Sequence, residues 1–273
     1  MNDARDKRKE PRRAIITGIC LLLGLWLFSF AASAIWPSAL RRCPFGRDAI
    51  RPDSTVCELA IGGLWVSLTV GVAAGALSTF IGSALAMASR AVGGAVEESS
   101  MRLADAFFAL PDVLVLMVLQ LAAQILGDVD PRLKIAPAPL MIFSLAAVGW
   151  AGPARMIRNR LATLETQDFI AASKALGAGR AHLLLRHLWP ALRSYVLAVF
   201  TARIPAAILA ESTVSFFGIA KVEPMSLGRY LGTSYASLLY PSGARIVLPA
   251  WVLLMLVVLG ASLASRAAAP ERG

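Results

Sequence analysis

The sequence predicts an all-α membrane protein with six transmembrane helices. Of its 273 residues, 57% are hydrophobic and 16% are charged, and the mean hydropathy is +0.66; a soluble domain carries about 25% charged residues. The apolar residues gather in blocks, several of them longer than the roughly 18 residues that a membrane-crossing helix needs. Each block is expected to be helical, because a helix satisfies its own backbone hydrogen bonds in lipid and no alternating, barrel-like pattern is present.

The predicted spans follow one another along almost the whole chain. They cover residues 14–36, 60–89, 103–126, 139–157, 195–220 and 246–265. Around them we expect a basic tail at 1–13, a first span with its external loop at 14–59, a main transmembrane domain at 60–266 and a tail at 267–273. Pro111 is expected to kink the third span.

The first apolar run has a second interpretation. A basic stretch precedes it and Ala32-Ser33-Ala34 follows it, as in a cleavable signal peptide. The run is longer than the apolar core of a typical signal peptide, and its removal would leave five spans with the C-terminus outside. A retained helix is therefore favoured.

The basic residues indicate which side of the membrane each connection faces. The net charge is +10, and it lies between the apolar runs rather than in a basic patch interleaved with aromatic residues, so nucleic acid is not an expected partner. With the N-terminus inside, 17 of the 27 Lys and Arg residues fall on the cytoplasmic side, as the positive-inside rule requires. Both termini are therefore expected in the cytoplasm.

Two connections are then expected outside. The loop at 37–59 holds Cys43 and Cys57, which either form a disulfide in that oxidising compartment or remain free thiols. Free thiols are slightly favoured, because sequence does not give the distance between the two residues. The loop at 221–243 contains SLGRYLG and is expected either to contact an external binding protein or an outer gate, or to be a surface re-entrant or connecting loop.

The connection between the fourth and fifth spans is the first candidate site. The stretch from Asp168 to Leu176 has helical spacing, with Phe169, Ala172 and Leu176 recurring at intervals of three and four. Gly177 is expected to end this helix in a left-handed conformation.

A second short helix is expected to follow it. It covers roughly 180–188, has Leu184, Leu185 and Leu188 on one flank, and is ended or kinked by Pro190. A protruding helix pair of this kind either docks into a groove of a soluble partner or lies among lipid headgroups. The spacing alone favours neither interpretation.

A charged residue inside the fifth span marks a second candidate site. Glu211 is followed by Ser212 and Ser215, and a carboxylate at membrane depth usually faces a pore or the interior of the bundle. These residues either line a translocation path, or the carboxylate holds helices together by pairing with Arg203, which lies about two helical turns away, or with the backbone of a neighbouring helix. The structural role is slightly favoured.

Motifs for chemistry are absent from the sequence. It has no phosphate-binding Gly-x-x-x-x-Gly-Lys-Ser/Thr loop and no hydrolase or metalloprotease signature. Its two histidines, His182 and His187, lie in the basic connection without a supporting cysteine or carboxylate cluster. We therefore expect no catalytic residue, no metal site and no cofactor. A stand-alone channel or secondary transporter is a rival of another class, but no internal repeat or carboxylate pair within the spans favours it.

Several stretches together resemble one family, the dipeptide/oligopeptide/nickel permeases of bacterial ABC importers, second-subunit type. The resemblance runs in order from Phe45 to Ser265. The stretches are FGRDAI at 45–50, RLADAFFALPDVLV at 102–115, AAVGWAGPARMIR at 146–158, ASKALGA at 172–178 and ILAESTVSFFG at 208–218.

This resemblance implies the type I (MetI-like) ABC permease fold over residues 60–266, with a cytoplasmic coupling helix that contacts an ATPase. The implied partners are a homologous second permease, two cytoplasmic ATPase subunits that bind the ATP, an extracytoplasmic solute-binding protein, and the lipid of the bacterial inner membrane. The implied solutes are di- or oligopeptides, with nickel or another small solute as the alternative. By position, the implied coupling residues are Asp168, Ala171, Ala172, Ser173, Lys174, Ala175, Leu176 and Gly177.

The chain departs from the family pattern at several positions, one of which is Ser173, where the coupling motif has its second alanine. Ala171 stands where the coupling motif has a glutamate, and Trp189 stands where it has a leucine before the proline. Ala261, near the end of the sixth span, replaces an acidic residue usual in the family. These departures indicate a divergent branch and leave open how the coupling helix binds without its glutamate.

Overall fold

The computed structural model describes residues 24, 26–32, 43–45, 54–175, 177–241 and 243–268. Every regular element in these ranges is a helix. The helices are α4 (Val56–Val92), α5 (Gly94–Ala109), α6 (Asp112–Val129), η1 (Pro131–Leu133), α7 (Pro137–Gly149), α8 (Ala151–Glu165), α9 (Asp168–Ala175), α10 (Arg180–Leu183), η2 (Leu184–Leu188), α11 (Trp189–Phe216), α12 (Leu227–Ser234), η3 (Tyr235–Leu239) and α13 (Gly243–Ala268).

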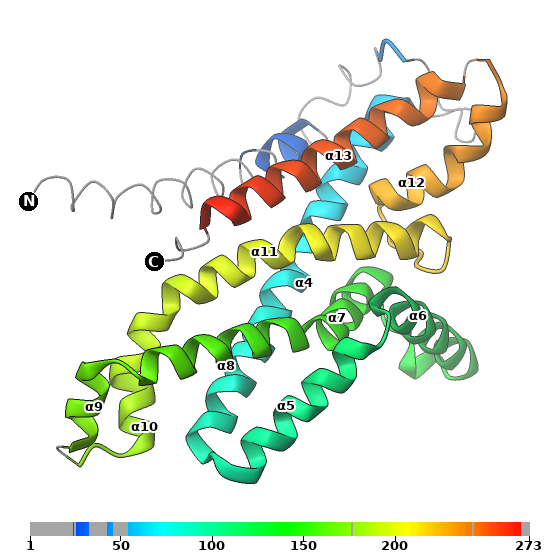
Figure 1. Ribbon diagram of the computed structural model, residues 1–273. Helices are drawn as coiled ribbons and strands as arrows, with labels where there is room; N and C mark the ends of the chain where they lie inside the picture. The colour runs from blue at the N-terminus through cyan, green and yellow to red at the C-terminus, as the bar shows by residue number, and fades with distance from the viewer. Residues whose placement is uncertain are drawn as a thin grey trace, which may run out of the picture.

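Helix α4 is the centre of the bundle. It packs against α11 and α13 and also against α7, α8 and α12 (Figure 1). Small residues permit these close approaches: a Cβ at Gly82 would lie 2.6 Å from the carbonyl oxygen of Trp150. Glycine at this position therefore lets α4 cross directly over the junction of α7 and α8.

The described residues contain four helices long and apolar enough to cross a membrane, and a fifth if the bent pair α7–α8 counts as one span. α4, α6, the α7–α8 pair, the run from η2 through α11, and α13 lie at the second to sixth predicted spans. Residues 26–32 of the predicted first span are helical. The rest of that span, the alternative cleavage site and both predicted tails lie almost entirely outside the described residues.

The predicted boundaries of the third and fourth spans are wrong. The third is broken at Leu110, which is extended (ψ 139°), and Pro111; a residue before proline is disfavoured in the helical region. The helix that crosses is α6, while α5, which carries several charges, is a separate element. The fourth span continues to Glu165 and bends by 43° between α7 and α8.

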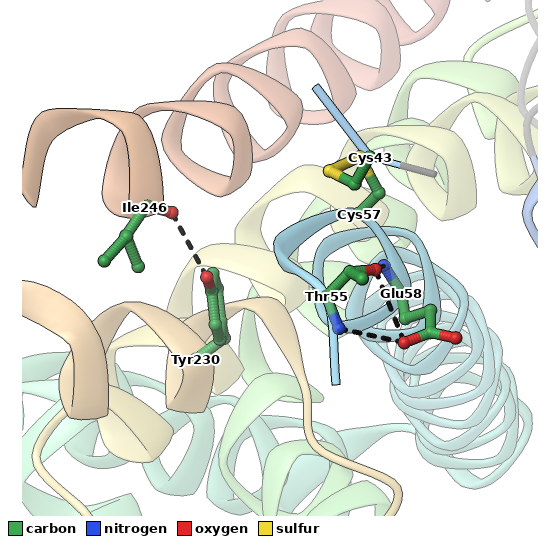
Figure 2. The surroundings of a disulfide bond; sticks show 6 residues. All are labelled: Cys43, Thr55, Cys57, Glu58, Tyr230 and Ile246. Carbon is green, nitrogen blue, oxygen red and sulfur yellow. Dashed lines mark hydrogen bonds between the residues drawn. A yellow bond between two sulfur atoms is a disulfide. The ribbon is translucent and has the colours of Figure 1, made fainter. Parts of the chain in front are cut away.

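A disulfide joins Cys43, in the loop predicted to be external, to the first turn of α4. Cys43 and Cys57 are bonded, with their Cα atoms 5.7 Å apart, so the slightly favoured expectation of free thiols is wrong. Thr55 caps the same turn: its hydroxyl accepts a hydrogen bond from the Glu58 backbone N–H, and the Glu58 carboxylate accepts one from the Thr55 N–H (Figure 2). The disulfide and the capping hydrogen bonds thus both restrain the first turn of α4.

The SLGRYLG stretch is part of the core rather than a surface connection. It forms α12, whose Leu227 and Tyr230 are 0% and 1% exposed. The Tyr230 hydroxyl donates to the Ile246 carbonyl of α13 at 3.2 Å (Figure 2). Sequence pattern missed this burial because the stretch is short and carries polar residues on its other side.

Candidate functional site

Helices α9 and α10 lie together at one end of the bundle, far from α12 and α6 (Figure 1). α9 confirms the helix predicted from residue 168. Its exposed positions include Asp168, Ala171, Ala172 and Ala175, and intervals of three and four put them on one face. Three of the four side chains are methyl groups, so a partner surface can approach the helix backbone closely.

The buried side of α9 differs from the predicted apolar spacing. Ile170 is 0% exposed, whereas Phe169 is 46% exposed. The Ser173 hydroxyl is half-buried and lies 3.5 Å from the His187 Nε2 atom. Ile170 and Ser173 therefore anchor α9, and the predicted site residues at 168, 171, 172 and 175 are left free to contact a partner.

Gly177 ends the α9 segment as predicted. Its φ is +83°, in the left-handed region that favours glycine, and the backbone N–H of Ala178 bonds to the Ser173 carbonyl at 3.2 Å. Gly177 is exposed, with open space where a Cβ would be. Of the other predicted coupling residues, Leu176 lies outside the described residues, and only the backbone of Lys174 is described.

The second short helix is anchored by a different set of leucines from the one predicted. Leu183, Leu184 and Leu188 are at most 5% exposed, but Leu185 is 67% exposed. The buried leucines pack with Ile170 and with residues of α8 and α11 in one hydrophobic cluster. α9, α10 and η2 therefore form a single packed unit, here called the coupling segment (residues 168–188).

Pro190 does not end the helix that precedes it. The chain passes from α10 through a π-helical turn, η2, directly into α11, with Pro190 in the first turn of α11. Proline is tolerated in a first turn because its absent N–H has no required partner there, and π turns accommodate such local changes of register. The coupling segment is thus continuous with the long α11 helix that crosses the bundle.

Four charged side chains, which the sequence did not single out, meet behind the coupling segment. Arg90, in the last turn of α4, bonds to two carboxylates. Its Nη1 donates to both Glu97 oxygens at 2.8 and 2.7 Å, and its Nε and Nη2 donate to the two Glu165 oxygens at 3.0 and 2.6 Å. Arg158 Nε also donates to Glu97, at 3.2 Å. One guanidinium therefore joins the ends of α4, α5 and α8.

Three of these side chains are partly shielded from water, which strengthens their interaction, whereas Arg158 is exposed. The side-chain exposures are 10% for Glu97, 19% for Glu165 and 30% for Arg90. Burial alone would raise the pKa of the Glu97 carboxyl, but the hydrogen bonds from Arg90 and Arg158 outweigh it and hold that pKa below its ordinary value. Glu97 is therefore ionised at neutral pH.

A cavity of about 250 Å³ separates the charged group from the coupling segment. Arg90, Glu97 and Glu165 line it together with Gly93 and Gly94 at the turn between α4 and α5. Ile170 and the three buried leucines of the coupling segment complete the lining. The charged group and the buried face of the segment thus line one common cavity.

The second candidate site is a fully buried carboxylate at the junction of three helices. Glu211 is 0% exposed and accepts hydrogen bonds from Ser67 Oγ of α4 at 3.1 Å, Ser212 Oγ at 3.3 Å and Ser215 Oγ at 2.7 Å. The Ser226 side chain, at the start of α12, also hydrogen-bonds to it. Sequence analysis placed Ser212 and Ser215 here but missed Ser67 and Ser226, which come from other helices.

The suggested pairing of Glu211 with Arg203 is wrong. The Arg203 guanidinium lies against Gly149 at the end of α7, next to Ser78 of α4, and interacts electrostatically with Asp112 at the start of α6. The two residues are two turns apart on α11, but they face different neighbours. Serine hydroxyls, rather than a cation, satisfy the Glu211 carboxylate.

The comparisons with known proteins match the chain to transport components. Residues 78–270 match the family model described as "Binding-protein-dependent transport system inner membrane component". The oligopeptide transport system permease protein OppC of Bacillus subtilis is 30% identical over 67% of this chain and 55% of its own length. OppC of Haemophilus influenzae is 29% identical over 77% of this chain and 61% of its own.

A third relative is the dipeptide transport system permease protein DppC of Bacillus subtilis, which is 25% identical over 81% of this chain and 69% of its own length. The chain thus spans 55% and 61% of the length of the two oligopeptide relatives. The family match over residues 78–270 includes the coupling segment and, of the Glu211 junction, every member except Ser67.

Proposed function

The chain belongs to the family of binding-protein-dependent transport system inner membrane components, and from that membership we propose that it is the permease subunit of an ATP-driven importer of di- or oligopeptides. The observation that carries the proposal is the family match over residues 78–270, which contains a packed helix segment with an exposed face of small residues. The solute class is supported by the relatives, which are named as oligopeptide and dipeptide transport permeases.

The proposed mechanism is alternating access driven through the coupling segment. Two cytoplasmic ATPase subunits bind the ATP, and the exposed face of α9 fits a groove on one of them. Because α9, α10 and η2 are packed as a unit and run on into α11, a displacement of the segment moves the bundle as a rigid body. A homologous second permease completes the path, and an extracytoplasmic binding protein delivers the solute.

The chain itself is proposed to be non-catalytic, with no bound cofactor. Its contribution is the path and the mechanical link, while ATP hydrolysis takes place in the partner subunits. This division of work is supported by the sequence, which carries no phosphate-binding loop.

The proposed topology places both termini in the cytoplasm. The disulfide between Cys43 and Cys57 supports it, because disulfides persist in the oxidising compartment outside the membrane. The coupling segment and the Arg90 group lie at the opposite end of α4 from this disulfide. The same orientation therefore places them on the side where ATPase subunits would be found.

Glu211, Ser212 and Ser215 are proposed to act on the translocation path by holding helices in place. The carboxylate is fully buried and bonded to hydroxyls from α4, α11 and the start of α12. It would thus fix α12 against the central helix and shape the path near its outer end.

The test is reconstitution of the whole transporter. The chain is co-expressed with the second permease, the ATPases and the binding protein encoded beside it, and the purified complex is placed in proteoliposomes. The proposal expects co-purification with the ATPases and ATP-dependent uptake of a labelled di- or oligopeptide. Uptake of nickel but not of peptides would change the proposed solute from peptides to nickel. Solute transport by the chain without any ATPase would overturn the assignment as an ATP-driven importer.

A further inference from the structure

The charged group behind the coupling segment has a geometry that goes beyond packing. Arg90 makes four hydrogen bonds, two to each of two carboxylates on different helices. Such two-point pairing of a planar guanidinium fixes direction as well as distance. One side chain therefore links α4, α5 and α8 at this end of the bundle.

The covalent path from this group to the coupling segment is short. Glu165 is the last residue of α8, and α9 begins at Asp168. The turn between them is held by backbone hydrogen bonds from Gln167 N–H to the Leu164 carbonyl at 3.2 Å and from Ile170 N–H to the Gln167 carbonyl at 3.0 Å. A displacement of α9 is therefore transmitted directly to Glu165.

The ends of α4 and α5 favour the charges that they carry. Arg90 lies in the last turn of α4, where the helix dipole attracts a cation, and Glu97 lies in the first turn of α5, where it attracts an anion. Between them, Gly93 and Gly94 have φ values of +74° and +58°, which fold the chain sharply. Arg90 and Glu97 thus pair across a turn whose sharp fold the two glycines permit.

From this arrangement we propose that Arg90 is the positioning residue through which the coupling segment moves α4 and α5. By holding Glu165 and Glu97 at once, Arg90 makes the end of α8 and the α4–α5 turn move together when α9 is displaced. The segment also packs on α8 and on Ala86 of α4 in one hydrophobic cluster, but that cluster contains no residue of α5, which Arg90 reaches through Glu97. The inference rests on the proposed function, because it concerns how an ATPase stroke would enter the bundle.

The test compares three variants with a matched control in the reconstituted complex. Arg90→Lys keeps the charge but cannot pair at two points with both carboxylates, Arg90→Ala removes the group, and Glu165→Gln removes one charge at constant shape. The control is Arg102→Ala, which breaks an equally short pair with Glu98 (2.6 Å) whose side chains are 79% and 64% exposed. Solvent-exposed ion pairs of this kind contribute little to the stability of a protein.

The deciding measurement is solute taken up per ATP hydrolysed. The inference expects this ratio to fall about fivefold or more, the lower end of typical coupling energies, in Arg90→Lys and Glu165→Gln, and to stay unchanged in Arg102→Ala. A merely structural role lowers the yield of complex but leaves the ratio per complex intact, and that result overturns the inference. If the Arg90 variants do not assemble, Glu165→Gln decides by the same criterion.

A second measurement does not depend on transport. Spin labels at Ser99 in α5 and Phe169 in α9, both exposed, report the distance between the two helices. The inference expects one narrow distance distribution in the wild-type chain and in Arg102→Ala, and a broadened one in Arg90→Lys. An unchanged distribution in Arg90→Lys overturns the inference, whereas a wild-type complex without ATP-dependent uptake would overturn only the proposed function.

Discussion

Ser67 and Glu211 lie 144 positions apart in the chain, yet the Ser67 hydroxyl donates a hydrogen bond of 3.1 Å to the Glu211 carboxylate. The same hydroxyl accepts a hydrogen bond from the Leu227 backbone N–H at 3.2 Å. One serine of α4 therefore joins the carboxylate of α11 to the first residue of α12. Buried polar groups joined in this way are costly to break, because each partner left behind is unsatisfied.

Removal of the Ser67 hydroxyl is therefore expected to destabilise the protein. Ser67→Ala leaves a buried carboxylate oxygen and a buried N–H short of a partner, at a cost of about 1–3 kcal/mol. Thermal unfolding in detergent measures the loss. Thr213→Ala is the control: Thr213 is half-buried on α11 and its hydroxyl bonds back to the Leu209 carbonyl of its own helix, so its loss should change stability by no more than ~0.5 kcal/mol. Equal unfolding temperatures for Ser67→Ala and Thr213→Ala would contradict the described junction.

The left-handed conformation of Gly177 predicts a difference between two nearby glycines. Gly177→Ala forces a side chain into a φ of +83° and should cost about 1–2 kcal/mol. Gly179→Ala is the control, since that glycine also has open space around it but does not have a positive φ. Protease sensitivity of the coupling segment should rise only in Gly177→Ala; an equal rise in both variants would show that flexibility, rather than handedness, matters here.

The exposed face of α9 predicts where a bulky side chain blocks partner binding. Ala172→Trp should leave the chain folded, because Ala172 is exposed, but should abolish co-purification with the ATPase subunits. Ala162→Trp, at an exposed position on α8, is the matched control and should co-purify normally. Retention of the ATPase by Ala172→Trp would place the docking face elsewhere.

The disulfide predicts both a chemical and an energetic result. Without reductant, mass spectrometry should find Cys43 and Cys57 protected from alkylation, and reduction should expose both. The bridge closes a loop with a sequence separation of 14, for which the chain-entropy model gives about 3 kcal/mol. The double substitution to serine should lower the unfolding temperature accordingly, and wild-type chains that alkylate fully without reductant would exclude the bridge.

The lowered pKa of Glu97 predicts a loss of stability in acid. A carboxyl whose pKa is lower in the folded than in the unfolded state contributes stability that is complete above its ordinary value of 4.5 and is lost as the pH falls through the folded value. As the pH falls below about 4.5, unfolding temperatures should therefore decline more steeply in the wild-type chain than in Glu97→Gln, whereas between neutral pH and that value the two should run in parallel. Curves that stay parallel below that value as well would show that the pairing with Arg90 does not shift the pKa of this carboxyl.

The sequence predicted features that depend on a few neighbouring residues. The α4 and α13 spans follow from unbroken apolar runs, and the beginning of α9 and its end near Gly177 follow from helical spacing and a glycine. The prediction of one continuous third span was wrong for an equally local reason, because the helix ends before Pro111 instead of being kinked there. The prediction that Leu185 shares a flank with Leu184 and Leu188 was wrong, because the sequence of adjacent leucines does not indicate which one faces the protein.

Composition and periodicity by themselves determined that this chain is a helical, membrane-spanning protein, and that an exposed segment separates two of its spans. Only the tertiary structure decided that Arg90 meets Glu165 and that Ser67 meets Glu211. The reason is physical: spacing along a helix fixes which side chains share a face, but the partner of that face depends on how several helices cross. The crossing points are set by packing among all the helices together, which no single stretch of sequence contains.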